Sequence, residues 1–146
     1  MILGFTNGCF DLLHEGHIYL LKKSRSYCDY LIVGLNSDNS VKRLKGKDRP
    51  IENQTIRYEN LKSISYVDEV IIFDEDTPYN LINRIKPDVL LKGSDYSNKK
   101  IVGAEIVKKN GGKVITIELL QGYSTTKKIS LLKEKERLWK FDTLKL

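Results

Sequence analysis

Short apolar runs alternate with segments of helical spacing along almost the whole chain. The apolar runs, rich in β-branched residues, span 2–5, 30–35, 67–73, 88–91 and 113–117. The helical segments, in which apolar residues recur three or four positions apart, span 16–27, 55–65, 77–86, 102–110 and 124–135. Strands that alternate with helices in this way indicate βαβ units and a mostly parallel sheet with helices on both faces.

The expected fold class is therefore α/β, with a Rossmann-like, doubly wound parallel sheet of five strands. A proline at 78 predicts a helix start, and Asn-Gly-Gly at 110–112 predicts a helix end. The length of 146 residues fits a single domain. We assign residues 1–132 to this domain and 133–146 to a C-terminal tail. Trp139 and Phe141 make the tail a candidate dimer contact or binding-site cover, and an ordinary charged end is the alternative.

The composition favours anionic partners. The formal net charge is +6, which suits phosphates, nucleotides, nucleic acid or an anionic membrane, although solubility alone also accounts for it. The basic residues are spread along the chain with one cluster at 41–49, which favours a phosphate pocket over a nucleic-acid surface. Two cysteines and two histidines are too few for a zinc motif or a histidine-rich metal site.

The N-terminus and the hydropathy pattern predict a cytoplasmic protein. The first residues lack the basic start and long apolar run of a secretory signal. No stretch approaches the roughly 20 apolar residues that a membrane span requires. We therefore expect small-molecule substrates as partners, with neither nucleic acid nor membrane.

Ligands of open parallel sheets bind outside the carboxyl ends of the strands. Here those ends are followed by 6–17, 36–49, 92–97 and 121–126, which hold most of the unusual residues of the sequence. These four segments are therefore where we expect the chemistry.

The segment 6–17, T-N-G-C-F-D-L-L-H-E-G-H, contains both histidines of the chain. His14 and His17 lie three positions apart, on one face of a helix start. Gly8 permits a tight turn, Gly16 lets a ligand approach the backbone, and helix N-terminal N–H groups bind anions. The pattern predicts a phosphate cradle with two imidazoles directed at it. The alternative, two capping or partly buried histidines, explains this combination of motifs less well.

Such a cradle suits phosphoryl transfer. When a phosphate attacks the α-phosphorus of a nucleoside triphosphate, negative charge builds on the transferring oxygens. The protein then contributes positioning and hydrogen-bond donors more than covalent chemistry. Imidazole N–H groups can supply such donors without a full charge.

Three further segments are candidates for the same site. The glycine and hydroxyls of G-Y-S-T-T-K at 122–127 offer donors to an anion, or an ordinary helix cap. In K-G-S-D-Y at 92–96, Asp95 could accept hydrogen bonds from ribose hydroxyls or a base edge, or the segment is an ordinary loop. The basic loop 42–50, followed by Arg57, could neutralise phosphate charge or simply be solvated.

The segment T-x-G-x-F-D-x-x-H-x-G-H resembles the signature of the cytidylyltransferase-like nucleotidyltransferases, and S-T-T resembles their C-terminal motif. This family includes glycerol-3-phosphate and choline-phosphate cytidylyltransferases and the adenylyltransferase that completes ADP-heptose. H-x-G-H alone is shared with class I aminoacyl-tRNA synthetases, for which this chain is too short. The resemblance covers about residues 4–130 and implies a homodimer.

The motifs and the resemblance together assign the site residues. The catalytic set is His14, His17, Lys45 and Thr125. The expected nucleotide contacts are Thr6, Asn7, Gly8, Cys9, Phe10, Gly16, His17, Lys92, Gly93, Asp95, Tyr96, Gly122, Tyr123, Ser124, Thr125 and Thr126. The expected acceptor contacts are Asp11, Asn36 and Arg57. Lys42 and Lys47 remain rivals to Lys45 for reaching the triphosphate. Mg²⁺ is expected with the nucleotide, held largely by phosphates and water, and Asp11 is the nearest candidate carboxylate.

The details resemble the heptose-1-phosphate adenylyltransferase branch most. N-G-C-F-D, V-K-R-L-K-G, R-P, E-D-T-P, P-D-V-L-L-K-G-S-D-Y and G-Y-S-T-T are similar to that branch. Glycerol-3-phosphate cytidylyltransferases typically carry an arginine where Leu119 stands, although the Y-V-D-E-V at 66–70 is also typical of them. The heptose enzyme is often fused to a sugar kinase, so this chain is expected to be either a free-standing version of it or a paralogue with a different acceptor or base.

The resulting prediction is a nucleotidyltransferase that joins a nucleoside monophosphate to a sugar phosphate and releases pyrophosphate, for lipopolysaccharide or capsule precursors. The alternatives are a CTP-dependent enzyme acting on glycerol 3-phosphate or another polyol or sugar phosphate, and a non-catalytic nucleotide-binding module. The expected mechanism is direct in-line attack. His14 and His17 stabilise the α-phosphate, and Lys45 with Ser124–Thr126 holds the β- and γ-phosphates.

Overall fold

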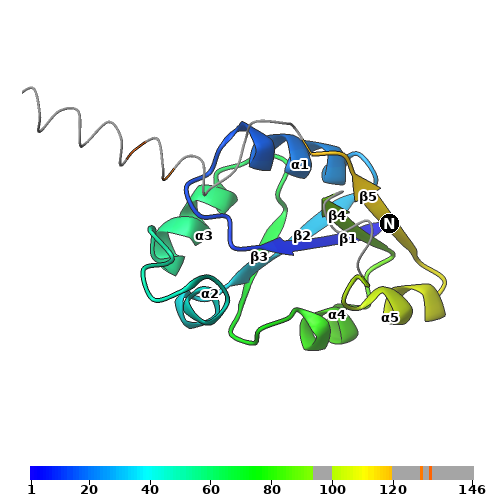
Figure 1. Ribbon diagram of the computed structural model, residues 1–146. Helices are drawn as coiled ribbons and strands as arrows, with labels where there is room; N and C mark the ends of the chain where they lie inside the picture. Colours follow the sequence, from blue (N-terminus) through cyan, green and yellow to red (C-terminus); the bar gives the residue numbers. More distant parts are fainter. Residues whose placement is uncertain (94–99, 120–128, 130–131, 133–146) are drawn as a thin grey trace, which may run out of the picture.

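The computed structural model describes residues 1–93, 100–119, 129 and 132. Five parallel strands form one sheet in the order β3-β2-β1-β4-β5 (Figure 1). Their bounds are β1 Leu3–Gly8, β2 Tyr30–Asn36, β3 Glu69–Phe73, β4 Val89–Gly93 and β5 Lys113–Ile117. The predicted five-stranded, doubly wound α/β fold is confirmed.

Helices cover both faces of the sheet. They are α1 Glu15–Arg25, α2 Asp38–Lys45, α3 Gln54–Lys62, α4 Tyr79–Ile85 and α5 Ala104–Lys109. Figure 1 shows α1 and α3 on one side of the sheet and α4 and α5 on the other. Two buried clusters match this division, one with Leu21 and Leu61 and the other with Ile82 and Val107. No helix in the described part of the chain is long and apolar enough to cross a membrane.

The predicted helix boundaries hold where local chemistry sets them. Pro78 directly precedes α4, and Asn110 ends α5 before Gly111, whose φ is +82°. Lys86 ends α4 in the left-handed region at φ +50°. Of the predicted helix 124–135, the structure describes Ile129 and Leu132, both helical. The predicted tail 133–146 lies outside the described residues.

Helix α2 is a correction, because no helix was predicted directly after β2 and residues 42–50 were expected to form a basic loop. The helix begins after Ser37, whose side chain accepts a hydrogen bond from the Ser40 N–H at 3.1 Å. Its eight residues include only two apolar side chains, Val41 and Leu44. Apolar spacing therefore could not reveal it, and the cap together with contacts to other segments holds it in place.

Gly34, in the middle of β2, marks a tight contact between strand and core. A Cβ atom there would lie 2.7 Å from the Phe5 Cζ atom. Phe5 is fully buried in the cluster that packs against α4 and α5. Because closely packed interiors cannot absorb an added methyl group freely, this position requires glycine.

We expect Gly34→Ala to lower the free energy of unfolding by about 1–3 kcal/mol, because the methyl group must displace the Phe5 ring. Urea denaturation measures the change. Ser24→Ala is the control, since the buried Ser24 hydroxyl has no hydrogen-bond partner among the described residues. Equal stability of Gly34→Ala and wild type would contradict the tight packing at this position.

Candidate functional site

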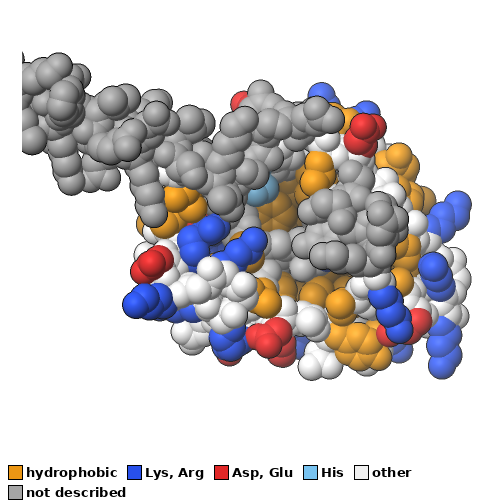
Figure 2. Space-filling view, viewed as in Figure 1, with side chains coloured by type: hydrophobic (Ala, Val, Ile, Leu, Met, Phe, Trp, Pro, Cys, Tyr) orange, Lys and Arg blue, Asp and Glu red, His pale blue; other side chains and the backbone are white. Residues whose placement is uncertain are grey.

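A pocket of about 470 Å³ opens at the carboxyl ends of the central strands. It lies where the chain order reverses between β1 and β4, the position at which open α/β sheets bind ligands. Its lining residues are Asn7, Gly8, Cys9, Phe10, His17, Asn36, Leu44, Lys45, Arg49, Asp76, Thr77, Pro78, Lys92, Lys100, Ile101 and Val102. Figure 2 shows a histidine at the hollow, with lysine and arginine side chains gathered beside it.

The two histidines form a reciprocal cap at the start of α1. His14 Nδ1 accepts a hydrogen bond from the Gly16 N–H at 3.1 Å, and His17 Nδ1 accepts one from the His14 N–H at 3.2 Å. The rings stack with their centroids 3.8 Å apart. A ring nitrogen that accepts a hydrogen bond carries no proton, so the proton of each neutral imidazole is on Nε2. The cap therefore sets both the tautomer and the orientation of the rings.

Both histidines thus take part in the cap of α1, and their role in catalysis stays a prediction. His17 lines the pocket, and His14 stacks on it from the N-cap position. Because their Nδ1 atoms bind the backbone, Nε2–H is the donor that each neutral ring offers. Such pre-oriented donors suit a site that must stabilise developing negative charge.

The turn before α1 is held in a strained backbone conformation. Phe10 and Leu12 have φ values of +48° and +52°, a region that costs non-glycine residues roughly 1–2 kcal/mol each. Phe10 is nevertheless fixed, because its ring is buried and lies 5.4 Å from the His17 ring, measured between centroids. A Cβ atom at Gly8 would lie 3.0 Å from the Phe10 ring, so a larger residue there would push on the ring. The strain is maintained where the backbone borders the pocket.

Asp11 ties this turn to the segment that precedes α3. Its carboxylate accepts hydrogen bonds from the Ile51 N–H at 2.7 Å and the Glu52 N–H at 2.9 Å, and lies 3.3 Å from Arg49 Nε. In the opposite direction, the Glu52 carboxylate accepts a hydrogen bond from the Leu12 N–H at 3.0 Å. Asp11 is 1% exposed and is not among the pocket-lining residues. This geometry indicates a residue that positions the turn, and the acceptor or metal contact expected of Asp11 stays a prediction.

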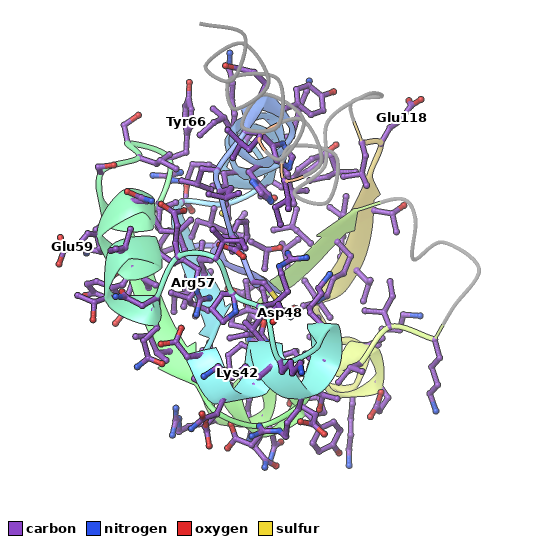
Figure 3. The ribbon with its side chains drawn as sticks, turned by 60° about the vertical axis from the view of Figure 1, so that its left-hand side comes forward. Lys42, Asp48, Arg57, Glu59, Tyr66 and Glu118 are labelled. Carbon is purple, nitrogen blue, oxygen red and sulfur yellow. The ribbon has the colours of Figure 1, made fainter. Side chains whose placement is uncertain are left out.

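Arg57 is also bound by the protein's own groups. Its side chain is fully buried and donates to the carbonyls of Glu52, Cys9 and Asn36 at 2.8–2.9 Å. It also forms an ion pair with Asp38 at 2.8 Å. Figure 3 shows Arg57 pointing inwards from α3, whereas Glu59 on the same helix points outwards. Arg57 thus holds together segments that border the pocket, and its expected contact with the acceptor stays a prediction.

The basic side chains of the pocket come from separate segments. Lys45 lines it from the end of α2, whereas its rivals Lys42 and Lys47 do not. Lys92 lies at the end of β4, buried, with its Nζ atom bonded to Asn7 Oδ1. Arg49 and Lys100 also line the pocket and were not selected from the sequence. The basic cluster at 41–49 was a signal for Arg49, and we found none for Lys100.

Several other expected residues lie close to the pocket without lining it. Thr6 is 1% exposed within β1, Gly16 is buried in α1, and Gly93 ends β4. Asn36 does line the pocket, and its side-chain N–H donates to the Ser40 hydroxyl at 3.0 Å. The remaining predicted contacts lie outside the described residues, namely Asp95, Tyr96, Gly122, Tyr123, Ser124, Thr125 and Thr126.

No group of three or more histidine, cysteine, aspartate or glutamate side chains that could hold a metal ion occurs in the described part of the chain. The cationic lining nevertheless suits a polyanionic ligand. Lys45, Arg49, Lys92 and Lys100 surround a space that also holds His17. In a partly desolvated site, such charges bind phosphates more strongly than they would in bulk water.

Comparison with known proteins defines the class to which this pocket belongs. Residues 5–137 match the model of the cytidylyltransferase-like family, so the chain belongs to that family. The resemblance seen in the motifs is thereby confirmed, and with it membership of a nucleotidyltransferase family.

More particular relatives share the name bifunctional protein HldE. The protein of Nitrobacter winogradskyi is 60% identical over 124 residues, which is 85% of this chain and 25% of that protein. The protein of Hyphomonas neptunium is 56% identical, over 85% of this chain and 26% of that protein. The chain thus spans about a quarter of the length of these relatives.

Solved structures agree with this placement. The lipopolysaccharide core biosynthesis protein from Thermoplasma volcanium GSS1 superposes with a TM-score of 0.66 at 30% identity, over 85% of this chain and 99% of that one. A pantoate-beta-alanine ligase from Francisella tularensis, in complex with an ATP derivative and beta-alanine, has a TM-score of 0.57 at 20% identity. That match covers 82% of this chain and 60% of the ligase, and it shows the fold alone.

We expect Arg57→Ala to lower the free energy of unfolding by about 3–5 kcal/mol, because it removes a buried charge and leaves its acceptors unpaired. Chemical denaturation measures the effect. Arg84→Ala, which removes an exposed arginine from α4, is the control and should change stability little. An Arg57→Ala protein of wild-type stability with weakened acceptor binding would favour the direct acceptor role.

We also expect Cys9 to react slowly with iodoacetamide at pH 7. Burial raises the pKa of the Cys9 thiol, although the nearby cations, led by Lys45, oppose the shift. Since only the thiolate reacts, labelling should rise with pH over a range above that of a free thiol. Because Cys9 lines the pocket, ATP should slow the labelling further.

Mass spectrometry of the labelled peptide measures this rate, with Cys9→Ser as the control for reaction elsewhere. Rapid labelling at neutral pH, or labelling that ATP does not slow, would contradict the environment described for Cys9.

Proposed function

We propose that this chain transfers AMP from ATP to a heptose 1-phosphate and releases pyrophosphate, forming a nucleotide sugar for lipopolysaccharide or capsule synthesis. Its motifs resemble the heptose-1-phosphate adenylyltransferase branch along most of their length. The 60% identity to a protein named HldE and the similarity to a lipopolysaccharide core biosynthesis protein support that branch. Since the chain spans a quarter of the HldE length, the proposal concerns only the activity that this part could carry.

The observation that carries the proposal is the histidine cap at the edge of a cationic pocket. The reciprocal hydrogen bonds of His14 and His17 orient donors before any ligand binds. Pre-oriented donors cost little reorganisation when charge develops in the transition state, which makes them effective catalysts. A plain phosphate-binding module would need cations but would have no need for this arrangement.

The proposed reaction is a direct in-line displacement. A phosphate oxygen of the acceptor forms a bond to the α-phosphorus of ATP, and the bond from that phosphorus to the bridging oxygen breaks. The electron pair leaves with pyrophosphate, so no covalent enzyme intermediate forms. His17 Nε2–H donates to the α-phosphate oxygens, and His14 orients His17 and contributes its own donor.

The cations of the pocket offset the charge of two approaching anions. Lys45, Arg49, Lys92 and Lys100 come from four different segments around one space. By resemblance, Ser124–Thr126 would add hydroxyl and backbone donors to the β- and γ-phosphates. Mg²⁺ would accompany ATP and be held by phosphates and water, because Mg²⁺ keeps several waters and uses few protein ligands in such sites. A homodimer and a cytoplasmic location stay predictions from the sequence.

We expect His17→Ala to reduce the rate of pyrophosphate release from ATP and heptose 1-phosphate by roughly 100-fold or more, because an oriented donor is lost. Lys45→Ala should also slow the reaction, whereas the matched control Lys42→Ala should not. Of these two lysines of α2, Lys45 lines the pocket and Lys42 does not. Equal release by wild type and His17→Ala would contradict the proposed chemistry.

A panel of nucleotides and acceptors distinguishes the alternatives. Heptose 1-phosphate with ATP should give the highest kcat/KM. A preference for CTP with glycerol 3-phosphate would favour the cytidylyltransferase alternative. Tight ATP binding with no pyrophosphate release on any acceptor would favour a non-catalytic nucleotide-binding module.

A further inference from the structure

One wall of the pocket is not used by the proposed phosphate chemistry. Asp76, Thr77 and Pro78 follow β3 and line the same space as the four cations. They belong to the E-D-T-P motif, which served as a helix start and as a point of resemblance, with none of its residues assigned to the site. A carboxylate in a pocket for two polyanions repels phosphate, so this wall must meet a different part of a ligand.

Helix α2 holds this wall in place through side chains spaced three residues apart. The Ser37 hydroxyl donates to Asp74 Oδ1 at 2.5 Å, and the Ser40 hydroxyl donates to the Glu75 carbonyl at 2.9 Å. Arg43 then binds Asp76 Oδ1 through its Nε at 2.7 Å, and the Asp74 carbonyl through a terminal nitrogen. Successive positions on one helix face thus hold successive residues of the loop. The same helix carries Lys45, so α2 positions both the wall at Asp76–Pro78 and one of the cations of the pocket.

Asp76 combines this fixed position with access to ligand. Its side chain is 62% exposed and lines the pocket, and its ion pair with Arg43 Nε uses the Oδ1 atom. An ionised carboxylate accepts hydrogen bonds and donates none, so it favours hydroxyl groups over phosphate oxygens. The adjacent Thr77 hydroxyl can both donate and accept. A pair of this kind suits the neighbouring hydroxyls of a sugar.

We propose that Asp76 and Thr77 bind hydroxyl groups of the acceptor sugar and so select a polyhydroxylated acceptor. This inference rests on the proposed function. Two sugars are present in that reaction, the acceptor and the ribose of the nucleotide. The nucleotide motifs follow β1 and β4, which are adjacent in the sheet, whereas Asp76 follows the edge strand β3, two strands from β1. The placement therefore assigns this wall to the acceptor.

The test is calorimetric titration of the protein, loaded with a non-hydrolysable ATP analogue. Heptose 1-phosphate and inorganic phosphate are titrated separately into wild type, Asp76→Asn and Thr77→Val. The amide of Asp76→Asn keeps an oxygen for Arg43 while removing the charge. Glu75→Gln is the matched control, because it removes a charge from the same loop at a side chain that does not line the pocket.

Asp76→Asn should weaken heptose 1-phosphate binding roughly tenfold, because a charged acceptor of hydroxyl hydrogen bonds is lost. Thr77→Val should weaken it less. Inorganic phosphate should bind Asp76→Asn as well as, or better than, it binds wild type, and Glu75→Gln should match wild type throughout.

Unchanged heptose 1-phosphate binding by Asp76→Asn would overturn the inference. If the ATP analogue, titrated into the unloaded protein, were then the ligand that binds Asp76→Asn more weakly, the wall would be assigned to ribose. Failure of wild type to bind heptose 1-phosphate would overturn the inference as well. Pyrophosphate release by wild type is measured separately. If the acceptor binds through Asp76 and no pyrophosphate is released, the proposed reaction fails while the binding assignment stands.

Discussion

The buried guanidinium of Arg57 is the interaction on which the pocket depends. A fully buried charge is tolerated only when it is paired and hydrogen-bonded, and Arg57 meets that requirement with three carbonyls and the Asp38 carboxylate. Its acceptors Cys9 and Asn36 lie at the ends of β1 and β2, and Asp38 begins α2. One side chain thereby fixes the turn that precedes the histidines relative to the helix that carries Lys45. Loss of this brace would change the distance between the donors and the cations.

The parts of the molecule that the sequence predicted well are those set by local chemistry. Apolar alternation identified the five strands, and the spacing of His14 and His17 placed both rings at one helix start. Helix α2 was missed because it has two apolar residues and depends on contacts with the loop after β3. Arg49, Asp76 and Lys100 line the pocket but were not selected. Arg49 lies in the basic cluster at 41–49 and Asp76 in the E-D-T-P motif, yet only tertiary structure brings their side chains to the pocket, and for Lys100 the sequence carried no signal.

A sequence motif identifies an important position more reliably than it identifies the role of the side chain at that position. Asp11 and Arg57 both carry the charges expected of substrate contacts, yet both are almost fully buried and bind the protein's own backbone. Burial and hydrogen-bond partners decide between the roles, and neither can be read from residue type. Lys45 illustrates the converse. Lys42 in the same helix and Lys47 just after it have the same side chain, but of the three only Lys45 lines the pocket.

The choice of histidine beside the cations follows from the requirements of the proposed reaction. Cations bind triphosphate and pyrophosphate alike, so each added lysine stabilises the ground state and the product together with the transition state. A neutral Nε2–H donor, held in place by a backbone hydrogen bond to Nδ1, adds little to that uniform attraction. Its benefit is greatest when charge concentrates on the oxygens around the α-phosphorus. In the proposed reaction the two kinds of side chain therefore have different tasks: lysine and arginine attract the anions, and the capped histidines stabilise the transition state more than the bound pyrophosphate.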